Sequence, residues 1–423
     1  MPIPYIFFVI ENGPPAWLRN NAWLVAEVVV AAVALWLLKI YTSGAICFAE
    51  RNMHGRVVMI TGGTSGIGEQ TTRELAARGA QIVLLTHVGP SDPFLADFIE
   101  DVRAQSGNQL VYAEQVDLTS LYSIRQFATK WIDNSPVRRL DTIILCAATL
   151  TPPGKPRTTT KEGLEETWMV NFLANFHLLG ILSPAIRAQP FDRDVRVIFT
   201  TCPSYIGSPP LREELDGRTW SPSKAYARSK LALMTFGQAF QKHLDAYKRP
   251  DEMPVSAKVI FVDPGLSRTP GMRRWLTRGT IWGLVVYLVS YIPVWFLLKS
   301  PWRGAQSILF AAMEPDLGRG VGGRFIKECM DVDFARQDIK DEAVAKKLWE
   351  ESDTLIEAVE TEQALKRAEA KKEEEKRAKE EKEKEKAEEV EALVGAIKKG
   401  QEAKKAKTAE KTKAKKKSKK AST

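Results

Sequence analysis

The chain has 423 residues, of which 44% are hydrophobic, and it carries a formal net charge of +9 at pH 7. This length accommodates one large catalytic domain of about 250 residues together with appendages. Residues 361–423 contain 22 Lys and Arg against 14 Asp and Glu, whereas the rest of the chain contains 39 against 38, so the near-neutral body argues against a folded basic face for nucleic acid.

The first element is an apolar segment, Ala22–Leu38, which is interrupted only by Glu27 and bracketed by Arg19 and Lys39. As a helix it would reach roughly 25 Å, slightly less than a hydrocarbon core of about 30 Å. We therefore expect residues 1–50 to associate with a membrane, either spanning it or lying shallow in it. A cleaved signal peptide and a buried soluble helix are the alternatives.

From Arg56 onward, short β-rich runs alternate with amphipathic stretches long enough for crossover helices. This alternation predicts an α/β fold of the Rossmann type, a doubly wound parallel sheet, in a domain that spans residues 51–360. The expected strands are Val57–Ile60, Gln81–Leu85, Thr142–Leu145, Val195–Phe199, Lys258–Val262 and Gly323–Ile326.

A second apolar run, Ile281–Leu298, contains 18 uncharged residues and includes Pro293. Its length alone is typical of a transmembrane helix. A single crossing would separate the expected helix Pro301–Ala312 and the strand after it from the sheet domain to which they belong. We therefore expect a re-entrant or surface-lying hydrophobic lobe beside the substrate entrance, kinked at Pro293. A soluble helix that lines the substrate pocket is the alternative.

Residues 361–423 are rich in Lys, Glu and Ala and contain almost no apolar residues for a buried face. Glu and Lys at helical spacing predict a solvated single helix as far as about Glu391, followed by a disordered Lys-rich tail. The tail is expected either to touch anionic lipid, at roughly 1 kcal/mol per basic residue, or to act only as a solubilising segment.

The first expected strand is followed directly by the glycine-rich run Thr61–Gly68 and then by a helix-like stretch from Glu69 to Arg78. Such a run provides a tight turn, a backbone that approaches pyrophosphate closely, and a helix packed on the sheet. This context favours a dinucleotide site over a glycine-rich turn without a ligand. The residues expected to line the site are Gly62, Ser65, Gly66, Ile67 and Gly68.

The Thr61–Gly68 run resembles the T-G-x-x-x-G-I-G motif of the short-chain dehydrogenase/reductase family, and other landmarks of that family follow in order. Asp117 follows the third strand, as does the family's aspartate that contacts the adenine. Pro264 and Gly265, with Thr269 four residues after Gly265, are similar to the family segment that closes over the nicotinamide. The resemblance therefore implies a nicotinamide dinucleotide cofactor.

The resemblance extends from about Arg56 to Glu357 and departs from the family pattern at Cys146–Ala148, where the family has Asn-Ala-Gly. The chain looks most similar to retinol-dehydrogenase-like and fungal lipid-droplet-associated members, which act on lipophilic carbonyls and alcohols at the endoplasmic reticulum or lipid droplets. The segments that carry this likeness are Val170–Leu173, Tyr226–Lys230, Pro264–Thr269, Arg303–Gln306 and Leu348–Trp349.

The end of the second strand indicates which cofactor to expect. Family members that prefer NAD carry an acidic residue there, which holds the ribose 2′-hydroxyl and would repel a 2′-phosphate. In this chain Leu85 is followed by Thr86 and His87, and Ser65 lies in the glycine run. The missing carboxylate favours NADP(H) bound beside Ser65 and His87, although no arginine clamp is evident.

Tyr226 and Lys230 form a Y-x-x-x-K pair, which places the phenol and the ammonium on one helix face. A nearby positive charge favours phenolate. The resemblance implies that Lys230 also holds the nicotinamide ribose while Tyr226 exchanges a proton with the substrate oxygen. It further implies that Asn171 supports a water-mediated proton relay to the lysine. A solvent-facing pair and a purely structural Asn171 are the alternatives.

The family's catalytic serine has no obvious counterpart in the segment Arg196–Tyr205. An ungapped match places Cys202 at the catalytic position. Thr201 supplies a hydroxyl after a shift of one residue, and Ser204 after a shift of two. Because a thiol is a poor hydrogen-bond donor, we expect Ser204 or Thr201 to stabilise the substrate oxygen.

These features predict a membrane-associated oxidoreductase that transfers hydride between NADP(H) and a lipophilic alcohol, aldehyde or ketone, such as a lipid, retinoid or sterol-like compound. We expect it at the endoplasmic reticulum or lipid droplets, facing the cytosol, with a homodimer as one option. The four dispersed cysteines predict neither a metal site nor a disulfide. The alternative function is a membrane-tethered nucleotide-binding or scaffold protein without turnover, favoured by Cys146 and the altered serine segment.

Overall fold

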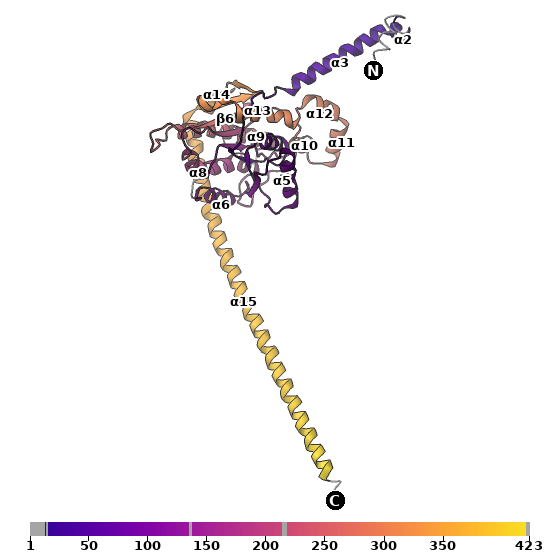
Figure 1. Cartoon of the computed structure of the whole chain (residues 1–423), viewed down its shortest axis with the longest axis vertical. Coiled ribbons are helices and arrows are strands. Elements are labelled where there is room, and N and C mark those ends of the chain that lie inside the picture. Colours follow the sequence, from indigo (N-terminus) through magenta and orange to yellow (C-terminus); the bar gives the residue numbers. More distant parts are fainter. Residues whose placement is uncertain (1–12, 14–15, 135–137, 214–217, 420–423) are drawn as a thin grey trace. The chain divides into compact units, whose positions relative to one another are not determined.

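The computed structural model describes residue 13 and residues 16–134, 138–213 and 218–419. The chain divides into two compact units, Met1–Ile356 and Glu357–Thr423. The first unit contains the sheet domain and the apolar N-terminal helix, and the second contains a single helical stretch (Figure 1). The catalytic motifs therefore all lie in the first unit.

Within the described residues, one sheet contains eight strands in the order β3-β2-β1-β4-β5-β6-β7-β8. Neighbouring strands are parallel except for β7 and β8, which form an antiparallel pair at one edge. The chain adds β2 and β3 on one side of β1 and then adds β4 to β7 on the other side. This reversal of the strand order between β1 and β4 confirms the expected doubly wound fold. The strands are β1 Val57–Thr61, β2 Gln81–Thr86, β3 Val111–Gln115, β4 Thr142–Leu145, β5 Val195–Thr200, β6 Ala257–Asp263, β7 Arg324–Lys327 and β8 Met330–Val332.

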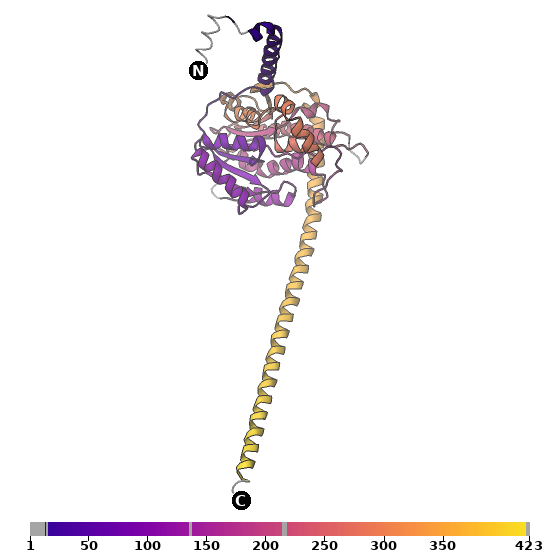
Figure 2. The ribbon, with the colours of Figure 1, turned by 90° about the vertical axis from the view of Figure 1, so that its right-hand side faces the viewer.

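Helices cover both faces of the sheet (Figures 1 and 2). On one face, α4, α5 and α13 join the strands in a continuous buried cluster of aliphatic side chains. On the other face, α6, α8 and α9 pack together and bury aromatic rings that include Phe176 and Phe236. Burial on both faces explains why the central strands are continuous apolar runs. These helices are α4 Gly66–Ala77, α5 Pro93–Ser106, α6 Leu121–Ile132, α8 Ala174–Arg187, α9 Pro222–Asp245 and α13 Pro301–Met313.

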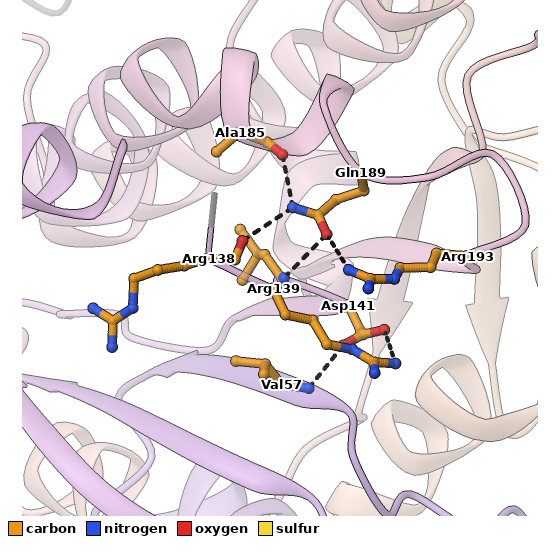
Figure 3. A network of polar contacts seen from close by, with 8 residues as sticks. Val57, Arg138, Arg139, Asp141, Ala185, Gln189 and Arg193 are labelled. Atoms are coloured by element: carbon orange, nitrogen blue, oxygen red, sulfur yellow. Dashed lines mark hydrogen bonds and ion pairs between the residues drawn. The ribbon is translucent and has the colours of Figure 1, made fainter. Parts of the chain in front are cut away.

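A polar network holds the amino ends of the central strands together (Figure 3). The buried carboxylate of Asp141, directly before β4, accepts hydrogen bonds from the Val57 amide at 2.8 Å and from Arg139 Nε at 2.6 Å. Gln189 donates to the Ala185 carbonyl at 3.0 Å and accepts from Arg193 at 2.8 Å. Because these contacts lie at the amino ends of parallel strands, they leave the carboxyl ends free for a binding site.

The N-terminal apolar segment forms α3, Ala22–Ser43, and none of its residues is buried. By length and composition α3 is one of two helices in the described residues that could cross a membrane. The other, Glu166–Arg187, is 83% buried and belongs to the core of the sheet domain. An apolar helix that buries none of its residues is typical of a segment that lies in lipid.

The second apolar run forms two short helices, α11 Ile281–Val289 and α12 Tyr291–Leu297, which contain no buried residue. At 1.5 Å per residue they reach about 14 and 10 Å, too little to cross a 30 Å hydrocarbon core. The expected kink at Pro293 was wrong by a few residues, because the helix breaks at Ser290. Pro293 instead lies in the first turn of α12, where its missing amide leaves no intrahelical bond vacant.

The last helix, α15, runs from Glu342 to Lys419. The expectation that helical structure ends near Glu391 was therefore wrong. Salt bridges four residues apart, such as Glu362–Lys366 and Glu373–Arg377, support the exposed helix where it has no buried face. The remaining short elements are α2 Ala16–Asn20, α7 Glu166–Trp168, the π-helical turn η1 Met169–Leu173, the 3-10 turns η2 Pro203–Gly207 and η3 Gln337–Lys340, α10 Pro270–Leu276 and α14 Pro315–Arg319.

Candidate active site

The glycine run forms the turn between β1 and α4, at the carboxyl edge of the sheet. Gly62 has a φ of +66°, and a Cβ there would lie 2.8 Å from the Ala147 Cα. A Cβ on Gly68 would lie 2.2 Å from the carbonyl oxygen of Gly62. Neither position accommodates a side chain, so the backbone itself forms a cradle at the start of α4, as a pyrophosphate requires.

Two hydroxyl residues complete this turn. Ser65 precedes α4 in an extended conformation, and its side chain makes no capping hydrogen bond to the helix. Thr61 Oγ1 accepts hydrogen bonds from the amides of Cys146 at 3.1 Å and Ala147 at 3.2 Å. The Thr61 hydroxyl thus joins the ends of β1 and β4. This contact lies at Cys146, where the family pattern has an asparagine. Ile67 is half-buried and packs toward Gly304 of α13.

The other expected cofactor residues follow the carboxyl ends of β2, β3 and β6. His87 is exposed just after β2, and Asp117 accepts a hydrogen bond from the Thr119 amide at 2.8 Å after β3. Pro264 is buried after β6, and the Gly265 amide donates to the Asp263 carboxylate at 2.9 Å.

The Pro264–Thr269 segment returns to the glycine run. A Cβ on Gly66 would lie 3.1 Å from Thr269 Cγ2, and Thr269 Oγ1 accepts from the Met272 amide to cap α10. Segments about two hundred residues apart therefore lie side by side at the carboxyl edge of the sheet, and the glycine cradle fits the phosphates of a dinucleotide.

Tyr226 and Lys230 lie on α9 and face the ends of β4 and β5. The Lys230 ammonium is buried, donates to the Thr200 carbonyl at 3.0 Å, and lies 5.6 Å from the centroid of the Tyr226 ring. Burial lowers the pKa of Lys230 from its ordinary value. Burial also raises the pKa of Tyr226 well above 10.0, and the neighbouring Cys202 adds to this shift.

The pKa of Tyr226 shifts in the direction opposite to the phenolate that the spacing of Tyr226 and Lys230 predicts. The phenol is desolvated by burial, and the Lys230 ammonium donates to the Thr200 carbonyl. Burial therefore favours the neutral phenol of Tyr226 over the phenolate. A neutral phenol is suited to donate a proton to an oxygen that gains charge.

Among the serine candidates, Cys202 contacts the Tyr226 hydroxyl, with its sulfur 3.8 Å away. Ser204 Oγ lies 2.8 Å from the Cys202 sulfur. Thr201 is buried, and its hydroxyl donates to the Met234 sulfur at 3.2 Å. The ungapped match therefore describes this geometry, and the Thr201 hydroxyl is committed elsewhere.

Comparisons with known proteins agree with this arrangement. Residues 56–278 match the family model described as short chain dehydrogenase. The chain belongs to the short-chain dehydrogenase family. It is 41% identical over 381 residues to the uncharacterized oxidoreductase pbr1 of Schizosaccharomyces pombe, covering 88% of this chain and 100% of that protein.

Two further relatives of this short-chain dehydrogenase carry substrate names. Polyprenol dehydrogenase of Mus musculus is 32% identical, covering 70% of this chain and 82% of that protein. Retinol dehydrogenase 13 of Homo sapiens is 31% identical, covering 77% of this chain and 92% of that protein. These names confirm the expected resemblance to retinol dehydrogenases and favour an oxidoreductase over a scaffold without turnover.

Asn171 lies in the π-helical turn η1 and is fully buried. Its side chain accepts from the Thr149 amide at 2.7 Å and donates to the Thr149 carbonyl at 2.9 Å and to Ser229 Oγ at 3.0 Å. Ser229 in turn donates to the Tyr226 carbonyl at 2.8 Å. Asn171 thus connects the loop after β4 to the catalytic helix, and its role in a proton relay stays a prediction.

Sequence reasoning did not single out Thr61, Thr200 or Ser229, which position the site through backbone contacts. Thr61 and Ser229 lie inside the two motifs, but a motif does not indicate which neighbour each hydroxyl contacts. Thr200 contributes only its carbonyl oxygen. Because every residue type has a backbone carbonyl, the identity of residue 200 could not predict this contact.

Proposed function

We propose that this short-chain dehydrogenase transfers hydride between NADP(H) and a lipophilic alcohol and its carbonyl counterpart at a membrane surface. The observation that carries the proposal is the convergence of Tyr226, Lys230 and Cys202 beside the glycine cradle. The retinol and polyprenol dehydrogenases among the relatives carry the names of isoprenoid alcohols. An isoprenoid or other long-chain primary alcohol is therefore the substrate class to test first.

The residues act as follows when a carbonyl compound is reduced. The nicotinamide dinucleotide supplies the hydride for the carbonyl carbon. Tyr226 breaks its O–H bond and gives the proton to the carbonyl oxygen, so that an alcohol forms. Lys230 places a positive charge near the resulting phenolate and stabilises it until solvent returns the proton. The reverse reaction requires Tyr226 as phenolate.

Cys202 occupies the place beside Tyr226 where a second hydrogen bond to the substrate oxygen is useful. Its thiol is a weak donor, but Ser204 contacts the sulfur at 2.8 Å and can polarise it or replace it after a small rotation. Ser204 therefore remains our candidate for the oxygen-side donor, acting with Cys202. Thr201 is not part of this proposal, because its hydroxyl contacts Met234.

NADP(H) is proposed over NAD(H) because the end of β2 carries no carboxylate. The Thr86 hydroxyl donates a hydrogen bond to the Val88 carbonyl at 2.9 Å. The next residue in the chain, His87, is exposed. A 2′-phosphate would meet no negative charge at these residues, and the Ser65 side chain is not engaged in capping α4. The same site would offer no carboxylate to a ribose 2′-hydroxyl.

Membrane association is proposed from the unburied apolar helices α3, α11 and α12. The endoplasmic reticulum and lipid droplets are the membranes to examine, with the catalytic domain on the cytosolic side, where free cysteines are stable. A homodimer is the assembly to test by light scattering in detergent.

The deciding experiment measures NADPH and NADH oxidation by detergent-solubilised protein with retinoid, polyprenyl, steroid and long-chain aldehydes or ketones. Tyr226→Phe serves as the matched variant, because it removes only the hydroxyl that transfers the proton. We expect turnover with NADPH that falls by at least about 10²-fold in Tyr226→Phe while NADPH binding is retained. Tight NADPH binding without turnover on any of these carbonyl compounds would instead favour a tethered nucleotide-binding protein.

A further inference from the structure

A cavity of about 450 Å³ lies where the apolar N-terminal helix meets the catalytic edge of the sheet domain. This volume is within the range of small-molecule binding sites. The cavity is assembled from the end of α3, the loops after β5 and β6, the end of α12 and the β7–β8 turn. Its lining residues are Tyr41, Thr42, Gly44, Ala45, Pro203, Asp263, Gly265, Leu266, Leu297, Lys299, Lys327 and Glu328.

One wall of the cavity is polar, and its charged groups have partners. Lys299 is buried and forms an ion pair with Glu328, whose second oxygen accepts from the Ala45 amide at 2.9 Å. The Asp263 carboxylate accepts a hydrogen bond from the Gly265 amide at 2.9 Å, and it lies 3.7 Å from the Lys327 ammonium. Because each of these charged groups already has a partner of opposite charge, an uncharged ligand can bind against this wall.

The cavity is also lined by exposed apolar side chains. Leu266 is 55% exposed and Leu297 is 60% exposed. Tyr41 adds an aromatic ring from α3. These residues adjoin α3 and α12, which bury none of their own side chains, so they face the same medium as the two helices.

Specific contacts hold α3 against α12. Lys39 donates to the Trp295 carbonyl at 2.6 Å and lies 4.5 Å from the centroid of the Trp295 ring. Thr42 donates to the Phe296 carbonyl at 2.6 Å. These bonds satisfy carbonyls in the last turn of α12, which has no further helical turn to bond them. The end of α3 and the end of α12 are therefore held together beside the cavity.

Two of the loops that line the cavity also carry residues of the catalytic edge. Pro203 follows Cys202 directly in the chain, and the Cys202 sulfur lies 3.8 Å from the Tyr226 hydroxyl. Gly265 and Leu266 belong to the segment that reaches the glycine cradle through Thr269. A ligand in this cavity would thus lie between the end of α3 and the loop that carries Cys202.

We propose that this cavity is the access route and chain-binding site for a long-chain apolar alcohol or aldehyde that diffuses in from the lipid. The inference rests on the proposed oxidoreductase function and adds the path and orientation of the substrate. The oxygen-bearing end lies toward Tyr226, and the chain leaves between Tyr41, Leu266 and Leu297. Chains longer than the cavity extend into the bilayer, so affinity rises roughly fourfold per methylene until the cavity is filled and little thereafter.

The first test is photolabelling of the full chain in nanodiscs, with a long-chain alcohol that carries a diazirine near the far end of its chain. The Tyr226→Phe variant is used so that label binds without turnover. We expect saturable labelling of the segments around Tyr41–Ala45, Leu266 and Leu297–Lys299, competed by unlabelled long-chain alcohol. Labelling spread along α3 and α11 without competition would overturn the proposal.

The second test narrows the cavity. In the Tyr226→Phe background, Leu297→Trp should weaken photolabel binding by at least about tenfold, because the indole displaces several methylenes of the ligand. Leu288→Trp, on α11 and outside the cavity lining, is the control, since Leu288 is 63% exposed. It should leave labelling within about twofold of the parent. Equal effects of the two substitutions would contradict the proposal.

NADPH titration by fluorescence shows whether the nucleotide site is intact in each variant. Saturable labelling of the cavity by a protein that reduces none of the carbonyl compounds would retain the chain-binding site and reject the enzymatic function. Turnover of long-chain aldehydes without labelling of the cavity would retain the enzymatic function and reject the chain-binding site.

Discussion

The cofactor cradle leads to a quantitative prediction for Gly68→Ala. A Cβ at this position would lie 2.2 Å from the Gly62 carbonyl oxygen and 2.9 Å from its carbon. The Gly62 backbone would have to move by about 1 Å, and a misplacement of that size costs on the order of 10²-fold in a positioned site. Gly62 cannot yield easily, because it also lies against the Ala147 backbone. We therefore expect the Kd for NADPH to rise about 10²-fold, or about 2.7 kcal/mol.

Gly180→Ala is the matched control for this substitution. Gly180 lies inside α8, is exposed, and a Cβ there would meet nothing within 4 Å. Alanine should raise the free energy of unfolding by about 0.5–1 kcal/mol, because it reduces the conformational freedom of the unfolded chain. NADPH binding should be unchanged. The same chemical change is thus expected to act on binding at one position and on stability at the other.

NADPH titration by fluorescence and thermal melting with and without NADPH would measure both effects. We expect NADPH to raise the Tm of wild type and Gly180→Ala but not that of Gly68→Ala at equal concentration. A normal melt of Gly68→Ala together with an NADPH Kd within about threefold of wild type would refute the cradle argument. A Gly68→Ala protein that unfolds far below wild type would show that the turn is needed for folding, and Gly66→Ala would then be the variant to titrate.

Three further predictions concern the chemistry of the site. Because burial raises the pKa of Tyr226 above 10.0, kcat/KM for carbonyl reduction should stay level through neutral pH and fall only above that value, whereas alcohol oxidation should rise with pH; a reduction limb near pH 7 would contradict this assignment. Cys202→Ser should raise kcat by up to about tenfold and Cys202→Ala should lower it, since a hydroxyl is the stronger donor, and steady-state kinetics with one aldehyde would compare them. His87→Asp should weaken NADPH binding by at least about tenfold and spare NADH, as measured by titration with both cofactors; equal loss for both would argue against a 2′-phosphate at His87.

The sequence by itself determined the class of fold and the two motifs. Period and length distinguish buried parallel strands from crossover helices locally, so β1, β2, β4, β5 and β6 could be placed before any contact was known. The glycine run and the Tyr226–Lys230 pair are also local, because a turn conformation and one helical turn impose them. The short strand β8 was not anticipated, since three residues with little burial give no periodic signal.

Only the tertiary structure decided which groups meet at the catalytic edge. Whether Cys202, Thr201 or Ser204 faces Tyr226 depends on how β5 ends against α9, and three neighbouring residues of similar size give no sequence signal for that register. The pKa of Tyr226 likewise depends on burial by elements distant in the chain. Local spacing favours the phenolate, whereas burial of Tyr226 favours the neutral phenol.

The cavity between α3, α12 and the β7–β8 turn is also a product of the tertiary structure. Its wall joins Ala45 to Glu328, and beside it Lys39 of α3 contacts Trp295 of α12; the residues of each pair are separated by more than two hundred positions. Hydrophobicity alone identified both apolar segments, because that property is read from each segment in isolation. Their meeting beside the catalytic residues depends on backbone carbonyls at the end of α12 that require partners, which no pattern in the sequence reveals.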